Sequence, residues 1–149
     1  MNTKNEVTGL FSTRVMIIDD TLEDIIIVKR AIQKLDPKCT FNYVFDGDEA
    51  IKILEEVRSV PDKLPHFIFL DLYMPRVGGY EILDWIKNDP VLSRIPIILF
   101  SSSDSNDDIL KAYNLRANAF ISKQSINTNF VVTVQETYKF WAQTAAVQA

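Results

Sequence analysis

Residues 67–80 read FIFLDLYMPRVGGY, and they place a carboxylate at the end of an apolar run. The run FIFL (67–70) predicts a buried strand, and Asp71 is the first polar residue after it. Burying an unpaired carboxylate is costly. Asp71 is therefore either a turn residue at the surface or one member of a group of side chains that offset its charge.

Four more short apolar runs alternate with helical patterns along the chain. They lack the strict alternation of polar and apolar residues, which is typical of parallel sheets covered by helices on both faces. Five such strand-then-helix units predict an α/β domain with a doubly wound, five-stranded parallel sheet. The predicted strands are 15–18, 41–45, 67–70, 97–100 and 119–121, and the predicted helices are 22–35, 48–57, 80–88, 106–115 and roughly 127–143.

The composition fits one globular domain and argues against several classes of protein. The chain has 149 residues, of which 47% are hydrophobic, and a net charge of −4 with scattered basic residues, so we expect no nucleic-acid surface. It has no membrane-spanning stretch, no signal peptide and a single cysteine, which indicates a cytoplasmic protein. We expect an N-terminal extension (1–13), one folded domain (14–143) and a C-terminal tail (144–149), with output through protein contacts.

Polar side chains follow four of the five predicted strands. Asp19 and Asp20 follow the first, Asp71 the third, Ser101 the fourth and Lys123 the fifth. The carboxyl ends of parallel strands meet at one edge of the sheet, where ligands bind. Three carboxylates need a cation between them, and oxygen ligands with room for water suit Mg²⁺. With a lysine and a hydroxyl beside them, the group is suited to forming and holding an aspartyl phosphate.

Each of these residues has a simpler explanation when taken alone. Asp19 and Asp20 are good helix caps, Asp71 is acceptable in a turn, and Lys123 is an ordinary solvated lysine. Their joint occurrence at the ends of strands favours the phosphoacceptor interpretation.

The motifs IIDD (17–20), FLDLYMPRVGG (69–79), LFSSS (99–103) and FISK (120–123) resemble the receiver domain of two-component response regulators. The resemblance covers residues 14 to about 142. It implies a flavodoxin-like fold with the strand order 2-1-3-4-5.

The resemblance also implies a role for each residue of the motifs. Asp71 would be the phosphoacceptor, and Mg²⁺ would be bound by Asp19, Asp20, Asp71 and the backbone carbonyl of Tyr73. The Tyr73 side chain is expected to cover the site and slow the loss of the phosphoryl group. The switch residues would be Ser101 (hydroxyl), Phe120 (aromatic) and Lys123 (phosphoryl contact). Such a protein is not classed as an enzyme but is a phosphoacceptor signalling protein that catalyses its own phosphorylation and dephosphorylation.

Three positions depart from the usual receiver pattern. Gln124 replaces a common proline, Gly78 a frequent Asp, and Arg116 a common glycine before the fifth strand. None of them removes a reacting group. The chain looks most like the small stand-alone receivers that work with bacterial phytochromes, which implies a histidine kinase of phytochrome type as donor and a downstream protein as target.

Two surfaces are predicted to bind partners. Ile26 lies opposite the apolar stripe of the first helix and Ile25 on the border of that stripe. Both are expected to be exposed beside the predicted site and to face the kinase or a neighbouring loop. Phe140 points away from the apolar stripe of the last helix, which favours a homodimer through the fourth helix, fifth strand and last helix. A downstream protein or the C-terminal tail is the alternative cover for Phe140. That last stripe is Phe130, Val131, Val134, Tyr138 and Trp141.

Three other functions fit the sequence less well than a phosphorylated receiver. A pseudo-receiver would serve as a non-phosphorylated interaction module, but all the expected reacting groups are present. A phosphatase or phosphotransferase of the haloacid-dehalogenase type needs a second Asp two residues after the first, where this chain has Tyr73. A flavodoxin needs a phosphate-binding Ser/Thr/Gly loop after the first strand, and none is seen.

Overall fold

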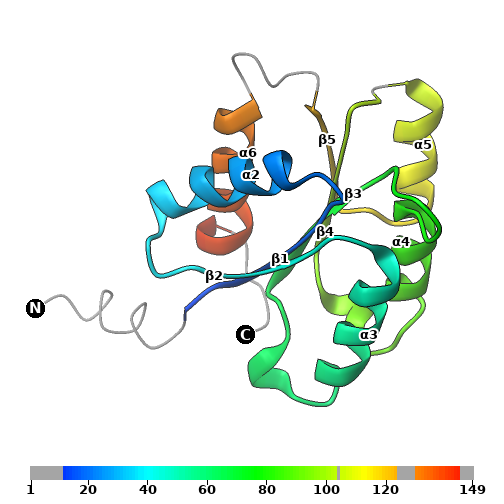
Figure 1. Ribbon diagram of the computed structural model, residues 1–149, viewed down its shortest axis with the longest axis horizontal. Helices are drawn as coiled ribbons and strands as arrows, with labels where there is room; N and C mark the ends of the chain where they lie inside the picture. Colours follow the sequence, from blue (N-terminus) through cyan, green and yellow to red (C-terminus); the bar gives the residue numbers. More distant parts are fainter. Residues whose placement is uncertain (1–11, 104, 124–129, 145–149) are drawn as a thin grey trace, which may run out of the picture.

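The computed structural model describes residues 12–103, 105–123 and 130–144 (Figure 1). The predicted N-terminal extension therefore lies outside the described residues up to residue 11, and the C-terminal tail does so from residue 145. Gln124, where the family pattern predicts a proline, also lies outside them.

Five parallel strands form one sheet in the order β2-β1-β3-β4-β5 (Figure 1). Every residue of the two strands β3 and β4 is buried, because helices cover both faces of the sheet. The predicted doubly wound α/β sheet with the flavodoxin-like order is therefore confirmed. The strands are β1 (Arg14–Ile18), β2 (Thr40–Val44), β3 (Phe67–Asp71), β4 (Ile97–Ser101) and β5 (Ala119–Ser122).

Two helices cover one face of the sheet and three cover the other (Figure 1). On the first face lie α2 (Leu22–Leu35) and α6 (Phe130–Lys139), which a π-helical turn (Phe140–Thr144) continues. On the second face lie α3 (Gly47–Val57), α4 (Gly79–Lys87) and α5 (Asn106–Asn114). Short 3₁₀ turns, Pro61–Lys63 and Leu92–Arg94, precede β3 and β4. Among the described residues, no helix combines the length and the hydropathy that crossing a membrane would require.

The two faces of the sheet have different cores because side chains alternate along each strand. The core under α2 and α6 is rich in aromatic rings that meet edge to face, such as Phe67 and Tyr138 with ring centres 5.5 Å apart. The core under α3, α4 and α5 is mostly aliphatic, with Ile68 and Leu70 of β3 at its centre. The same alternation therefore predicts the face of the sheet from which each residue just after a strand projects.

The helices begin after residues that are favoured as N-caps, but the buried faces of two helices differ from the prediction. Asp46 accepts a hydrogen bond from the backbone N–H of Glu49 at 2.8 Å, and Ser105 caps α5 in the same way. Ile25, which was predicted to be exposed, is only 1% exposed, because α6 lies beside α2 and closes that side of the helix. Val131, predicted to be in the core, is 38% exposed, because the buried face of α6 follows an i, i+4, i+8 spacing from Phe130.

Two arginines have backbone conformations that glycine adopts easily. One lies between α5 and β5, and the other lies in the loop after β3. Arg116 has a φ of 71°, and Arg76 has a φ of 64°. Arg116 is the position where receivers commonly have a glycine, and its guanidinium donates a hydrogen bond to the Lys87 carbonyl at 3.0 Å. The departure from the family pattern thus leaves the left-handed turn in place.

Gly79 lets the loop after β3 fold back closely on Asp71. Its N–H donates to the Leu72 carbonyl at 2.8 Å, and a Cβ added there would lie 2.7 Å from the Leu72 Cα and also against the Asp71 carbonyl. At Gly78, the nearest atom to an added Cβ is 3.8 Å away.

Gly79→Ala is therefore expected to lower the free energy of unfolding by about 2 kcal/mol or more, since backbone must shift to admit the methyl group. Gly78→Ala is the matched control and should stay within about 0.5 kcal/mol of the wild type. Urea unfolding followed by circular dichroism measures both. Equal stability of the two variants would contradict the close approach.

Candidate functional site

Asp19, Asp71 and Lys123 converge at the carboxyl edge of the sheet. Each lies two residues beyond a side chain of the aromatic core, Ile17, Phe69 and Ile121, so all three project from the face that α2 covers. The Lys123 Nζ lies 2.9 Å from Asp19 Oδ2 and 3.0 Å from Asp71 Oδ1. Asp71 is thus a buried residue with partners, and not a surface turn residue.

Asp24, in the first turn of α2, supplies a third carboxylate to the same lysine. Its Oδ2 lies 2.9 Å from the Lys123 Nζ. Asp24 was not among the site residues predicted from the sequence, although its place in the first turn of the helix that covers this face could have indicated a contact with the site. One ammonium group is therefore shared by three carboxylates, with the exposed carboxylate of Asp20 beside them.

The cluster is short of positive charge. Burial and, after it, the neighbouring Asp19 carboxylate raise the pKa of Asp71 to about 7, although Lys123 opposes the shift. Burial also raises the pKa of Asp19. Burial disfavours the Lys123 ammonium, but hydrogen bonds to Asp24 and Asp19 raise its pKa overall. A further cation would therefore be stabilised here.

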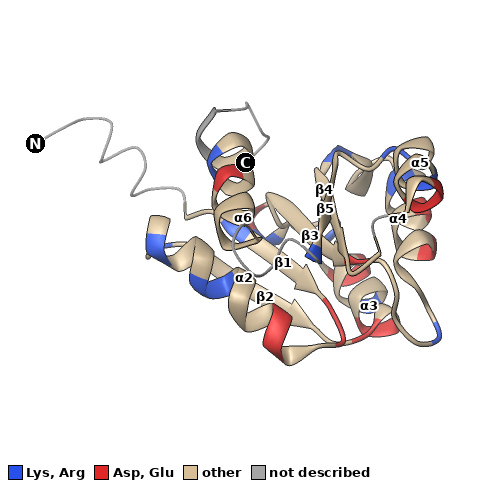
Figure 2. Cartoon of the chain, turned by 90° about the horizontal axis from the view of Figure 1, so that it is seen from above, with Lys and Arg blue, Asp and Glu red and all other residues tan. Residues whose placement is uncertain are grey.

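Three of the carboxylates have the spacing of a cation site. One oxygen each of Asp19, Asp20 and Asp71 lies within 4.8 Å of the other two. A hollow of about 260 Å³ opens beside them and is lined by Asp20, Thr21, Asp24, Asp71, Tyr73, Ser102 and Lys123. Figure 2 shows acidic residues gathered beyond the ends of the central strands. Hard oxygen donors, a negative balance of charge and room for water fit Mg²⁺.

The predicted switch residues lie on the other side of the sheet edge. Ser101 is fully buried at the end of β4, and its Oγ accepts a hydrogen bond from the backbone N–H of Ser103 at 3.1 Å. Phe120 is half-buried and packs against the aliphatic core under α5. The side chain of Tyr73 is 56% exposed at the mouth of the hollow.

A model of the response regulator receiver domain matches residues 15–135 of the chain. The chain belongs to the response regulator receiver family. This result agrees with the cluster of aspartates and lysine, and it confirms the resemblance seen in the sequence motifs.

Several solved structures and curated proteins are similar to this receiver. The phosphorylated cyanobacterial phytochrome response regulator RcpA is 30% identical, covers 93% of this chain and 100% of its own, and has a TM-score of 0.85. The Mn²⁺-bound form of the response regulator Rcp1 is 26% identical, with coverages of 92% and 99% and a TM-score of 0.82. The sequence of Rcp1 from Synechocystis sp. is 26% identical over 91% of this chain and 92% of that protein. A probable methanogenesis regulatory protein, FilR2 of Methanothrix harundinacea, is 28% identical over 85% and 82%.

Asp108 of the receiver is a second residue that sequence reasoning missed. Its carboxylate accepts hydrogen bonds from the hydroxyls of Tyr73, Tyr80 and Ser103. The hydrogen bonds from Ser103, Tyr80 and Tyr73 lower the pKa of Asp108 to about 2, so it is a carboxylate at neutral pH. No motif marks this residue, because its three donors come from two loops and a helix that meet only in the fold.

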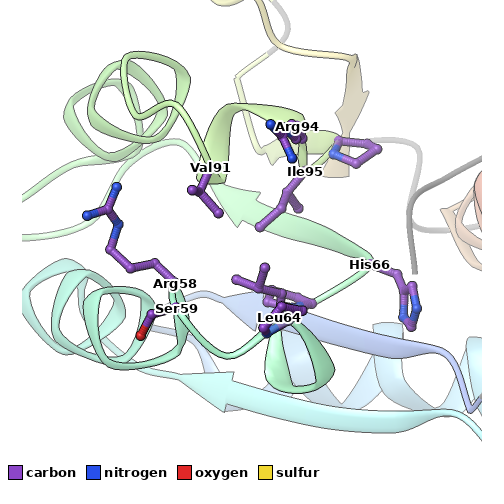
Figure 3. Close-up of a pocket in the computed structure, with 10 residues that line it drawn as sticks. Arg58, Ser59, Leu64, His66, Val91, Arg94 and Ile95 are labelled. Carbon is purple, nitrogen blue, oxygen red and sulfur yellow. The ribbon is translucent and has the colours of Figure 1, made fainter.

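A second hollow, of about 280 Å³, opens where β3 and β4 begin, at the opposite edge of the sheet (Figure 3). Arg58 at its rim pairs with Asp89 at 2.8 Å, and the imidazole Nδ1 of His66 accepts a hydrogen bond from the N–H of Arg14. Burial lowers the pKa of His66. Among the described residues, no carboxylate lines this hollow, so they offer no phosphoacceptor there.

Proposed function

We propose that this receiver accepts a phosphoryl group from a histidine kinase on Asp71, with Mg²⁺ in the acidic cluster, and signals through contacts with other proteins. The observation that supports this most directly is the buried Lys123 ammonium, which lies within 3.0 Å of both Asp19 and Asp71. A structural ion pair would need one carboxylate. A surplus of carboxylates around one lysine is suited to a site that binds a further cation, here Mg²⁺, for its reaction.

In the proposed transfer, an Oδ of Asp71 forms a bond to the phosphorus while the bond from phosphorus to the donor histidine nitrogen breaks. The electron pair of that bond stays on the imidazole, which leaves as the neutral ring after taking a proton. Lys123 would contact the transferred phosphoryl oxygens, and Ser101 would donate its hydroxyl to them. Ser101 must then exchange its hydrogen bond with Ser103 for one with the phosphoryl group, and Phe120 follows as the aromatic switch.

Asp19, Asp20 and Asp71 would hold the Mg²⁺, together with the backbone carbonyl of Tyr73. The metal, when bound, neutralises charge that develops on the phosphoryl oxygens. The similarity to Rcp1, which has been solved with Mn²⁺ bound, supports a divalent ion here. The similarity to phosphorylated RcpA supports Asp71 as the phosphoacceptor and a phytochrome-type kinase as the donor. Ile26, half-buried on α2 close to Asp24, belongs to the proposed kinase-docking surface.

A homodimer is proposed through α5, β5 and α6, which flank one edge of the sheet. β5 is the last strand in the order, and both neighbouring helices expose large apolar side chains. These side chains are Leu110, Tyr113, Val132 and Phe140. Phe140 is 50% exposed and meets the Trp141 ring edge to face, so it is held in one place on the surface.

Acetyl phosphate with Mg²⁺ is expected to add one phosphoryl group to the wild type, measured by intact mass. Asp71→Asn should take none, because the nucleophilic carboxylate is gone. The control Asp107→Asn removes an exposed carboxylate from α5 and should be labelled like the wild type. Labelling of Asp71→Asn to the wild-type level would refute the phosphoacceptor assignment.

Asp20→Ala is expected to weaken Mg²⁺ binding by at least about tenfold, since it removes one ligand and one negative charge. Isothermal titration calorimetry at fixed pH measures the affinity. Asp107→Ala is again the control, because it changes the net charge equally and lies outside the cluster. Equal affinities for wild type and Asp20→Ala would exclude Asp20 as a ligand.

Phe140→Asp should convert a dimer to a monomer in sedimentation velocity at tens of micromolar. A charge at the centre of an apolar interface must be buried or must open the interface. Tyr43→Asp, at an exposed position on the far edge strand β2, should remain dimeric. Each protein is run with and without a phosphoryl analogue. A monomeric wild type in both conditions would show that the exposed patch has another partner.

A further inference from the structure

Asp108 lies at the meeting point of three structural elements around the acidic hollow. Tyr73 comes from the loop after β3, Tyr80 from the first turns of α4, and Ser103 from the loop after β4. The Tyr73 hydroxyl lies 2.7 Å from Asp108 Oδ1 and 2.8 Å from Oδ2, and the Tyr80 hydroxyl lies 2.6 Å from Oδ1. The Ser103 hydroxyl donates to Oδ2. The Asp108 carboxylate thus has hydroxyl donors on both of its oxygens.

This arrangement fixes a side chain that would otherwise be free at the surface. Tyr73 is 56% exposed, yet it lines the hollow that contains Asp71 and Lys123. A half-exposed tyrosine has few packing contacts to hold its ring in one rotamer. Its hydroxyl donates to a charged carboxylate, which makes a strong hydrogen bond, and the acceptor lies 35 positions away in the chain. The position of the ring over the hollow therefore depends on Asp108.

Asp108 is itself held in place. Its backbone N–H donates to the Ser105 Oγ, which begins α5, and Tyr80 anchors it from α4. The anchor also reaches the switch, because Ser103, which donates to Asp108, donates its backbone N–H to Ser101. The link between Tyr73 and Asp108 does not include Ser101, so it can persist when Ser101 turns toward a phosphoryl group.

We propose that Asp108 is a positioning residue that holds the Tyr73 ring over the mouth of the acidic hollow and so limits the access of water to phosphorylated Asp71. This inference rests on the proposed function. In the reaction it slows, a water oxygen bonds to the phosphorus and the bond from phosphorus to the Asp71 oxygen breaks. The water proton leaves with inorganic phosphate, and Asp71 returns to its carboxylate form.

The test measures the rate of phosphate loss from protein labelled with acetyl phosphate and then desalted into Mg²⁺ buffer. Asp108→Asn should lose phosphate about tenfold faster than the wild type, the factor expected when one hydrogen bond to a charged group no longer favours the covering rotamer. Tyr73→Phe should show a similar increase. The double variant Asp108→Asn/Tyr73→Phe should be no faster than either single variant, because both substitutions break the same link.

Two controls separate positioning from a general loss of structure. Tyr80→Phe removes one hydrogen bond to Asp108, which its contacts with the Ser103 hydroxyl and the Ser105 Oγ still hold in place, so its rate should stay near the wild type. Asp107→Asn removes a neighbouring charge from the first turn of α5 and should also have no effect. Thermal unfolding midpoints are compared for all variants, and a structural role alone would lower the midpoint without producing the non-additive rates.

The outcomes separate this inference from the proposed function. If the wild type takes no phosphoryl group, both are refuted. If it is labelled, but Asp108→Asn loses phosphate at the wild-type rate, only the role of Asp108 is refuted. Additive rates in the double variant would also refute it, since Asp108 and Tyr73 would then act independently.

Discussion

The buried ammonium of Lys123 holds the carboxyl edge of this sheet together. It is 7% exposed, and it balances carboxylates from β1, α2 and β3, of which Asp19 is fully buried. A buried carboxylate without such a partner would be neutralised or would expose itself to water. Since three carboxylates share one lysine, the lysine offsets their negative charge only in part. The same shortage of positive charge that makes the site costly for the fold suits it to a divalent cation.

The rest of the molecule keeps this edge in register. Because side chains alternate along the strands, the residues two positions past Ile17, Phe69 and Ile121 all emerge on the face covered by α2. The core below them is rich in aromatic rings, whereas Ser101 and Phe120, which we predict to be the switch residues, border the aliphatic core under α3, α4 and α5. The charged cluster and the switching residues thus occupy opposite faces of one sheet, and they meet only at its edge.

Much of this could be predicted from the sequence, since it depends on local patterns. The strand runs, the caps at Asp46 and Ser105 and the aspartates at strand ends are all readable in a single chain. The errors have tertiary causes. Ile25 is buried because α6 happens to lie beside α2, and Val131 is exposed because α6 is rotated by a fraction of a turn from the predicted orientation. Asp24 and Asp108 were missed because their partners come from distant segments, although the place of Asp24 in the first turn of α2 could have indicated its contact.

The position of Lys123 in the chain also bears on the order in which the domain can form. Lys123 is 104 residues from Asp19, and contacts over such distances form late because a long loop must close first. β1 and β3 are adjacent in the sheet, whereas β5 lies at its edge beside β4. In any partly folded state that lacks β5, the carboxylates of Asp19 and Asp71 have no lysine to offset them and must stay hydrated or protonated. The acidic edge is therefore complete only when the last strand has joined the sheet, so the site depends on the whole domain and not on its N-terminal half alone.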